Sequence, residues 1–599
     1  MKKIIKIVLC IFMAIYPLIW IISASNALVF NKYTTNLIFQ ISYIIHPFLI
    51  LLAIRKLVLN SLNAVLIAEI IIMLEYLLIK SIRASEFSSN DTQIQTVIFS
   101  INIGIVVFAF MKSKVIKPIT EEKNVNQNPL GFLFKAQPNN VSLDNPTRGI
   151  YVQGGAGSGK SESFIKPIIK QAVEKNFSGV LYDFKSPELS HYLLFYFQKQ
   201  NSNIKPYFVD FKNPQNSHRV NPLAPKYLEK SAHAFEYSEV IINNLLPETI
   251  KQRQFWDRDA QSILTGLIWY VKKTYPQYCT LPHIISLVLE CDAETLMNKV
   301  SSDPEASGMV TSIRQAMQRG AEKQVAGVIS TLQTALSRLN APDVFWLLSG
   351  DDVDLNINDP ENPKFLCLGN DSTLSSTYAP AISLIISTCA RLMNQPNRHH
   401  SIIILDEAPT IYIPNFEMIP ATARSNRVAT VFGVQDYSQI VQRYGVEKAQ
   451  VILANLGNQF FGRTSNAKTA EMIKSVFSKE DKTYWTKGTS KGTGGGMLFQ
   501  PKRNTGNSYS QSIQERDKVK VSTILNSKTG QFFGIVAEGE PREIIEYQFD
   551  YDKTSIPKMN FSDKVVSKSD INSNYSRIIS ESKGMLLDEV KPTNNLISL

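Results

Sequence analysis

The chain has 599 residues, of which 44% are hydrophobic and 19% charged, and its formal net charge at pH 7 is +11. This is an ordinary globular composition, and the length is enough for about three or four domains. No two cysteines lie close together and the histidines show no metal-ligand spacing, which argues against a zinc site or a disulfide framework and fits a reducing compartment. The cysteines are Cys10, Cys279, Cys291, Cys367 and Cys389.

The first 112 residues hold most of the apolar excess. Four segments there approach the length of about 20 residues that spans a bilayer. The third is the least apolar, because it carries Glu69 and Glu75, which such a span tolerates where they face a neighbouring helix. We therefore predict an α-helical membrane anchor of several spans over residues 1–118. The segments are residues 4–23, 35–54, 59–79 and 95–112.

Basic residues precede the first span, separate the second from the third, and follow the fourth. The positive-inside rule therefore places both ends of the anchor in the cytoplasm. Because these residues supply part of the net charge, that charge supports nucleic-acid binding only weakly. A competing interpretation makes residues 1–25 a cleaved signal peptide, which would leave three spans and put the following domains on the other side of the membrane. The basic residues are Lys2, Lys3, Lys6, Arg55, Lys56, Lys112, Lys114 and Lys117.

A polar linker over residues 119–147 leads to a phosphate-binding pattern. The octapeptide Gly154-Gly155-Ala156-Gly157-Ser158-Gly159-Lys160-Ser161 follows the β-rich run Ile150-Tyr151-Val152 and precedes a helix-compatible run, which disfavours an ordinary Gly-rich turn. Its backbone N–H groups would cradle phosphate oxygens, Lys160 would reach the β- and γ-phosphates, and Ser161 would sit on Mg²⁺. We therefore predict that ATP and Mg²⁺ bind at Gly154, Gly155, Ala156, Gly157, Ser158, Gly159, Lys160, Ser161 and Glu162.

Strands alternate with helices on either side of a long helical region. Strands are predicted at 179–182, which leads into Asp183, and at 206–210. They indicate an α/β domain with a parallel, doubly wound sheet. Residues 229–345 show helical periodicity and are interpreted as an all-α domain, inserted between two parts of a nucleotide-binding domain. The two parts are residues 148–228 and 346–550, and the predicted helices are 232–246, 255–273, 283–300 and 306–340.

The sheet resumes at residues 365–368 and continues with an apolar run at 402–405 that ends in Asp406 and Glu407. Such a run indicates a buried parallel strand with acids at its carboxyl end, where open α/β sheets bind ligands. Taken alone, it is more often a strand that runs into a turn. Paired with the phosphate-binding loop, it predicts that Asp406 holds Mg²⁺ and that Glu407 orients and polarises the attacking water.

The next strand, residues 429–434, ends in Gln435. This amide reaches the same edge of the sheet as Asp406, either as a γ-phosphate sensor or as an ordinary loop amide. Arg424 and Arg427 lie on the segment before this strand, where a basic side chain could reach the nucleotide of a neighbouring subunit. Most arginines are simply solvated, so both interpretations of these residues stay open.

The last part of the chain is more polar. Residues 479–520 are rich in Gly, Ser, Thr, Lys and Asn and are predicted to be a flexible basic insertion, either in contact with DNA phosphates or solvated. Residues 530–536 are predicted to form a closing strand. Residues 551–599 are predicted to be a loosely ordered polar tail.

These motifs, in this order, resemble the type IV coupling proteins of conjugation and type IV secretion, the TraG/TraD-like branch of the RecA-like DNA-pumping ATPases. The resemblance runs from about residue 148 to 480 and over 520–545. Besides the octapeptide, the motifs that carry it are Tyr182-Asp183-Phe184-Lys185, Phe255-Trp256, Leu264-Thr265-Gly266-Leu267, Ala326-Gly327-Val328-Ile329-Ser330-Thr331, Leu405-Asp406-Glu407-Ala408-Pro409, Gly433-Val434-Gln435-Asp436, Ser438-Gln439, Asn455 and Thr469-Ala470-Glu471.

The resemblance implies a RecA-like P-loop domain that bears an all-α domain, and an anchor that lies in the lipid of the bacterial inner membrane. It also implies a homo-hexameric ring whose ATPase domain is in the cytoplasm. Members of the family recruit relaxase-bound DNA, single- or double-stranded, and hand it to the secretion channel using ATP. Carried over by position, Lys160, Ser161, Asp406 and Glu407 are the nucleotide and catalytic residues. Gln435 matches the family's glutamine, and Arg424 best matches its candidate arginine finger.

The chain also departs from the common family pattern. Four closely spaced spans resemble the anchors of mobilisation-type members in Bacteroidota rather than the usual two-span anchor, and the Gly-rich insertion is not a common feature. Two alternatives to a DNA translocase for conjugation stay open. One is a chromosome-segregation translocase, for which no separate C-terminal winged-helix module is visible. The other is a docking receptor for protein substrates that uses nucleotide only for assembly.

The four-span anchor makes a direct topology prediction. Reporter fusions after Lys32 and Glu86 should report the periplasm, and fusions after Lys56 and Lys117 should report the cytoplasm, because the basic segments stay inside. Paired phosphatase and fluorescent-protein fusions at each point provide the measurement. A periplasmic signal after Lys117 would contradict the four-span anchor and support the signal-peptide alternative.

Overall fold

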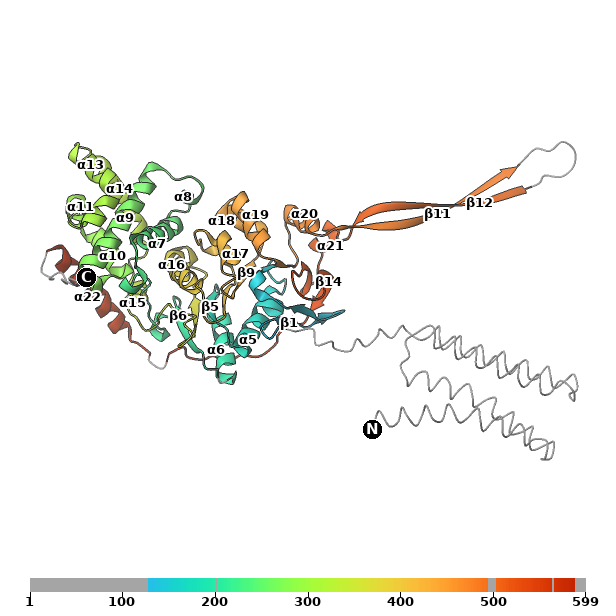
Figure 1. Cartoon of the computed structure of the whole chain (residues 1–599), viewed down its shortest axis with the longest axis horizontal. Coiled ribbons are helices and arrows are strands. Elements are labelled where there is room, and N and C mark those ends of the chain that lie inside the picture. Colours follow the sequence, from blue (N-terminus) through green and yellow to red (C-terminus); the bar gives the residue numbers. More distant parts are fainter. Residues whose placement is uncertain (1–127, 201, 494–502, 563–564, 588–599) are drawn as a thin grey trace, which may run out of the picture. The chain divides into compact units, whose positions relative to one another are not determined.

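The computed structural model describes residues 128–200, 202–493, 503–562 and 565–587 (Figure 1). The four predicted spans lie outside these residues. Within the described part of the chain, no helix combines the length and the apolar character that crossing a bilayer requires.

A large mixed sheet forms the centre of the described region. Its ten strands lie in the order β2-β14-β13-β10-β4-β9-β8-β5-β7-β6. All neighbours from β10 to β6 pair in parallel, whereas β13, β14 and β2 add an antiparallel edge. The strands are β2 (Ala136–Gln137), β4 (Ile150–Gln153), β5 (Ser178–Asp183), β6 (Lys205–Asp210), β7 (Lys364–Gly369), β8 (Ser401–Leu405), β9 (Val428–Val434), β10 (Asn458–Phe461), β13 (Gln531–Ile535) and β14 (Glu543–Phe549).

The central strands are apolar along their whole length because the sheet is covered on both faces. Along β8, Ile402 and Ile404 belong to one buried cluster and Ile403 and Leu405 to another. Successive side chains of a strand point to opposite faces, so these two clusters are the two sides of the sheet. The predicted α/β class with a parallel-rich sheet is therefore confirmed.

Helices α5 and α6 supply the first of these clusters, and α16 belongs to the second (Figure 1). Shorter elements complete the nucleotide-binding region. The helices are α5 (Lys166–Glu174), α6 (Glu188–Gln200), α16 (Ser375–Met393), α17 (Ile419–Thr422), α18 (Tyr437–Tyr444), α19 (Val446–Asn455), α20 (Ala467–Val476) and α21 (Val521–Leu525), and the small sheet at the start pairs β1 (Phe132–Phe134) with β3 (Val141–Leu143).

Only helices and turns connect β6 to β7, and every residue of this stretch is described. Two of the long predicted helices are divided here. Asp292 caps a new helix by accepting a hydrogen bond from the Thr295 N–H, and Gly320, at φ 77°, ends another. The helices are α7 (Ser231–Leu245), α8 (Glu248–Lys251), α9 (Phe255–Thr274), α10 (Leu281–Glu290), α11 (Ala293–Ser301), α12 (Pro304–Met309), α13 (Thr311–Gln318), α14 (Glu322–Ser337) and α15 (Pro342–Leu348).

The segment predicted to be a flexible insertion contains regular structure instead. Strands β11 (Lys479–Thr493) and β12 (Arg503–Asp517) pair with each other in an antiparallel ladder and join no other sheet. The Gly, Ser and Thr content favoured a loop. Cross-strand pairing satisfies the backbone groups on the facing edges of the two strands, and this composition does not prevent it.

The tail also differs from the prediction, because helix α22 (Lys568–Leu586) packs against the helical region. Ser567 caps it in a capping box with Asp570, a signal that the sequence does contain. Its apolar stripe is buried, and the Tyr575 ring lies 5.0 Å from the Phe345 ring of α15. The buried His283 of α10 pairs with Glu581 at 3.0 Å.

We expect the Ile578→Asp variant to release α22, because Ile578 is fully buried and an unpaired carboxylate there would cost about 3 kcal/mol or more. Trypsin should then cleave at Arg577 and Lys583 at least about tenfold faster, since about 1.4 kcal/mol of opening free energy is a factor of ten. The exposed Ser576→Asp change is the matched control. Equal cleavage rates in the two variants would contradict the docked helix.

Candidate active site

The phosphate-binding loop connects β4 to α5. Gly157 and Gly159 adopt positive φ values of 73° and 93°, which side chains with a Cβ rarely tolerate. One π-helical turn, Ser161–Ile165, then leads into α5. The buried Ser158 hydroxyl has no hydrogen-bond partner, so a polar group is left unsatisfied inside the loop. The backbone path and this orphaned hydroxyl both fit a bound phosphate.

The order of the strands brings the sequence motifs together. Strand β9 lies between β4 and β8 and is parallel to both, with Gln153 opposite Val434 and Leu405 opposite Phe432. The carboxyl ends of the three strands therefore lie at one edge of the sheet. This edge carries the phosphate-binding loop, Gln435 and the two acids that follow β8.

Lys160 bridges the loop and the end of β8. Its Nζ donates a 2.7 Å hydrogen bond to Glu407 Oε1 and a 2.8 Å bond to the Asp406 carbonyl oxygen, and lies 3.6 Å from Asp406 Oδ1. All three residues are at most 7% exposed. A buried charge needs a partner, and the single ammonium of Lys160 offsets only part of the negative charge of the two acids.

Gln435 completes this group, because its Nε2 lies 3.4 Å from Glu407 Oε1. Burial raises the pKa of Glu407, and the Lys160 ammonium opposes that shift. A carboxylate with a raised pKa accepts a proton more readily than an exposed one. Glu407 therefore has the position and the basicity to act on a water molecule at this edge.

Asp406 has an unsatisfied acceptor, since its Oδ1 is buried and has no hydrogen-bond partner. A divalent cation prefers hard oxygen ligands such as this carboxylate and the nearby Ser161 hydroxyl. The residues present thus fit Mg²⁺. Gly433 keeps the strands close here, because a Cβ in its place would lie 2.2 Å from the Asp406 carbonyl oxygen.

Two hydroxyls hold the loop that follows β8. Thr410 Oγ1 donates a 2.6 Å hydrogen bond to the Glu407 carbonyl oxygen and lies 2.8 Å from the Tyr182 hydroxyl. Asn370 donates to the same tyrosine at 2.9 Å. The backbone that carries Glu407 is therefore fixed from the neighbouring strands β5 and β7.

Asp183, at the end of β5, also belongs to this edge, although its sequence position suggested no role for it. Burial raises its pKa to about 7, and Asp406 adds to the shift. Its Oδ2 accepts hydrogen bonds from the Ser190 N–H at 2.9 Å and hydroxyl at 2.7 Å, whereas its Oδ1 has no partner. The signal available in the sequence was an acid directly after a buried strand.

The two arginines that are candidates for an arginine finger, Arg424 and Arg427, have contacts outside the Lys160 group. Arg424, whose side chain is 42% exposed, lies 3.7 Å from Glu538 in an ion pair. Arg427 adopts a positive φ of 56°, and its guanidinium donates to the Arg398 carbonyl oxygen at 3.4 Å. Within this chain, neither forms a hydrogen bond or an ion pair with Lys160, Asp406 or Glu407 among the described residues.

The family described as "Type IV secretory system Conjugative DNA transfer" has a sequence model that matches residues 112–519. A curated relative, the coupling protein TraD of Escherichia coli (strain K12), is 20% identical over 344 residues, which cover 55% of this chain and 44% of TraD. The chain thus spans less than half of the length of this relative.

Solved structures of similar fold are also known. The bacterial conjugative coupling protein TrwBdeltaN70, in a trigonal form in complex with sulphate, is 13% identical, with a TM-score of 0.50 over 70% of this chain and 88% of that one. The plasmid coupling protein TrwB in complex with ADP and Mg²⁺ is 13% identical, with a TM-score of 0.48 and the same coverage. At this identity the first of these shows a shared fold.

A double-mutant cycle measures the interaction free energy between Lys160 and Glu407 directly. Lys160→Met should destabilise the nucleotide-free protein, because it leaves Glu407 buried without a cation. The same change in a Glu407→Gln background should lower the free energy of unfolding by less, and the difference, the coupling free energy, should be about 1–3 kcal/mol. Denaturant unfolding of the four proteins gives the result. Additive effects would show that the two side chains do not interact in solution.

Proposed function

We propose that this chain, which belongs to the type IV secretory system conjugative DNA transfer family, is an ATP-driven DNA translocase that delivers relaxase-bound DNA to a secretion channel. The observation that carries the proposal is the buried pairing of Lys160 with Glu407 at the edge of the sheet beside the phosphate-binding loop. A protein that uses nucleotide only as a structural ligand does not need a buried, water-activating acid at this position.

In the proposed reaction, the loop N–H groups bind the phosphates of ATP, and Lys160 exchanges Glu407 for the β- and γ-phosphates. Ser161 and Asp406 hold Mg²⁺, which neutralises phosphate charge when it is bound. The freed Glu407 carboxylate orients a water molecule and accepts its proton. Gln435, beside Glu407, reports the presence of the γ-phosphate to β9 and α18.

The remaining parts of the proposal concern assembly and location. The N-terminal 118 residues anchor the chain in the lipid of the bacterial inner membrane, with the ATPase in the cytoplasm. Six copies form a ring, which lets an arginine of one subunit reach the nucleotide of the next. Relaxase or relaxosome proteins and components of the type IV secretion channel are the protein partners, and DNA is the cargo.

The function is tested by plasmid mobilisation with a Lys160→Ala variant. Transfer should fall to background even when the variant and the wild type are compared at equal abundance in the membrane, because Lys160 supplies charge to the phosphates. Lys199→Ala removes an exposed lysine from α6 of the same domain and should leave transfer unchanged. Mobilisation at the wild-type level by Lys160→Ala would contradict the proposed translocase and favour a docking receptor that does not hydrolyse ATP.

Catalysis should also require a neighbouring subunit. The transition state gains negative charge that Lys160 and Mg²⁺ offset incompletely, and a trans arginine contributes on the order of 10³-fold or more in rate. We expect Arg424→Ala to bind ATP but to lose DNA-stimulated hydrolysis, and its mixture with Glu407→Gln to recover some activity at mixed interfaces.

The structure supplies a control for this experiment, because Arg424 pairs with Glu538. Glu538→Gln breaks that ion pair, and also the one between Glu538 and Arg148, but keeps Arg424, so it should hydrolyse ATP normally. Wild-type hydrolysis by Arg424→Ala, or mixtures with no recovered activity, would show that Arg424 is not the finger. Arg427→Ala is then the next variant to measure.

A further inference from the structure

A cleft of about 440 Å³ lies on the far side of the loop that carries Glu407. Its walls come from α8 of the helical region, from the residues after Glu407 and from α18. The polar and charged residues that line it are Glu248, Lys251, Thr410, Gln439, Gln442 and Arg443. These side chains gather at the junction of the helical region and the sheet, and among them Thr410 also belongs to the candidate active site.

Arg443 is the most informative residue of this cleft. Its guanidinium donates a 2.9 Å hydrogen bond to the amide oxygen of Asn244, and its Nε is buried with no hydrogen-bond partner. No carboxylate pairs with it among the described residues. A half-buried cation without an anion is costly unless a ligand supplies the negative charge.

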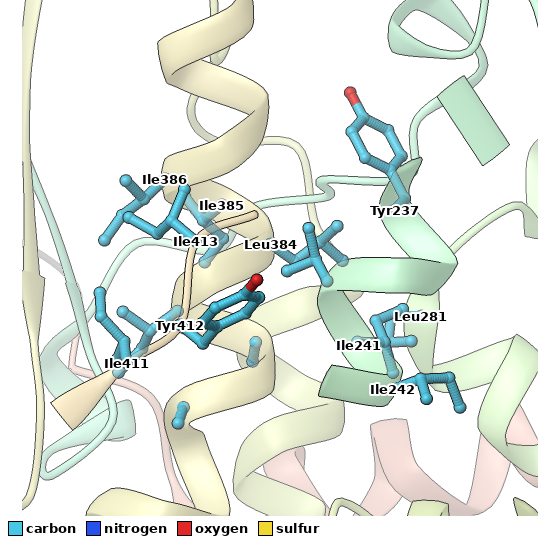
Figure 2. Packing of buried hydrophobic residues seen from close by; sticks show 14 of the residues in the cluster. Tyr237, Ile241, Ile242, Leu281, Leu384, Ile385, Ile386, Ile411, Tyr412 and Ile413 are labelled. Carbon is cyan, nitrogen blue, oxygen red and sulfur yellow. The ribbon is translucent and has the colours of Figure 1, made fainter. Parts of the chain in front are cut away.

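Asn244 holds Arg443 in place without neutralising it. The Asn244 amide also accepts a 2.9 Å hydrogen bond from the Tyr412 N–H and donates a 2.8 Å bond to the Tyr412 carbonyl oxygen. Figure 2 shows Tyr412 and its neighbours Ile411 and Ile413 packed beside α16 in the buried cluster. The segment that follows Thr410 is thus held by buried contacts from Ile411 onward.

The other charges of the cleft lie at its exposed rim. Lys251 and Glu248 are both exposed on α8, and neither forms an ion pair within the described part of the chain. The lining therefore has two cations and one acid. Gln439 and Gln442, on successive turns of α18, add amide donors beside Arg443.

The cleft shares a wall with the candidate active site. Thr410 lines the cleft, and its hydroxyl bonds to the Glu407 carbonyl oxygen at 2.6 Å. The same residue, Glu407, bonds through its carboxylate to Lys160. The Thr410 hydroxyl is thus a direct connection between the cleft and the backbone of the proposed catalytic acid.

We propose that this cleft binds a backbone phosphate of the DNA cargo, through Arg443, Lys251 and the two glutamines, and that binding repositions Glu407 and so stimulates ATP hydrolysis. A guanidinium with amide donors is the usual recognition chemistry for a phosphodiester, and such contacts carry no sequence preference. The inference rests on the proposed translocase function and adds to it the contact through which DNA acts on catalysis.

The test uses the full-length protein in detergent, with a single-stranded and a duplex oligonucleotide as probes. ATP hydrolysis is followed as DNA is added, and each variant is normalised to its own rate without DNA. We expect Lys251→Gln to raise the half-saturating DNA concentration about three- to tenfold, Arg443→Gln to raise it at least about tenfold, and Glu248→Gln to lower it, since that change removes the repelling acid.

Salt dependence supplies a readout that a folding defect does not produce. Loss of one phosphate contact should reduce the slope of log affinity against log salt by about 0.7 for single strands and about 0.9 for duplexes. Lys323→Gln, an exposed lysine of α14 remote in sequence from the cleft, is the control and should retain the wild-type slope and affinity.

The outcomes separate this inference from the proposed function. If the wild-type protein hydrolyses no ATP with or without DNA, the translocase proposal fails. If hydrolysis is stimulated by DNA but Lys251→Gln and Glu248→Gln match wild type in affinity and slope, the cleft is not the DNA contact. Stimulation of the wild type by inorganic phosphate alone would assign the cleft to free phosphate and overturn the DNA inference.

Discussion

The arrangement of the site depends on one buried ion pair, in which the Lys160 ammonium joins the phosphate-binding loop to Glu407 across β9. Burial gives this pair its importance, because a carboxylate removed from water is costly unless a cation lies beside it. A nucleotide changes that balance, since its phosphates compete for the ammonium. In the proposed reaction, nucleotide binding and activation of the acid are one event: the lysine that moves to the phosphates leaves a carboxylate of raised pKa free to act on water.

One amide of the helical region bonds to both segments that leave this edge. Asn244 of α7 bonds to the backbone of Tyr412, which follows the loop of Glu407, and to Arg443 at the end of α18, which follows Gln435. The two polypeptide segments that leave the active site thus meet at one residue of the inserted helices. This arrangement connects the insertion to the proposed catalytic acid, and in our proposal Arg443 is the point at which DNA acts on ATP hydrolysis.

The central strands and the site motifs could be predicted because both depend on local signals. The apolar run 402–405 and the Gly pattern of 154–161 have the strand and loop structures that their composition favours. Strand β10 and helix α22 were missed, since their burial comes from partners distant in the sequence, such as β4 for β10. Strand β14, which pairs with the nearby β13, and strands β1 to β3 within the predicted linker were missed as well. The proximity of Lys160, Glu407 and Gln435 could be expected from the parallel strands. Three other features could be seen only in the folded structure: the position of β9 between β4 and β8, the place of Asp183 at this edge, and the cleft at Arg443.

The central claim is that the Lys160–Glu407 pair is the resting form of a hydrolytic site and opens when nucleotide binds. A structure of the protein with Mg²⁺ and a non-hydrolysable ATP analogue tests it most directly. We expect Lys160 Nζ to contact the β- and γ-phosphates, Asp406 and Ser161 to face the metal, and the distance from Lys160 Nζ to Glu407 Oε1 to exceed the present 2.7 Å. An analogue bound elsewhere, or one bound in the loop with the Lys160–Glu407 hydrogen bond intact, would contradict this account.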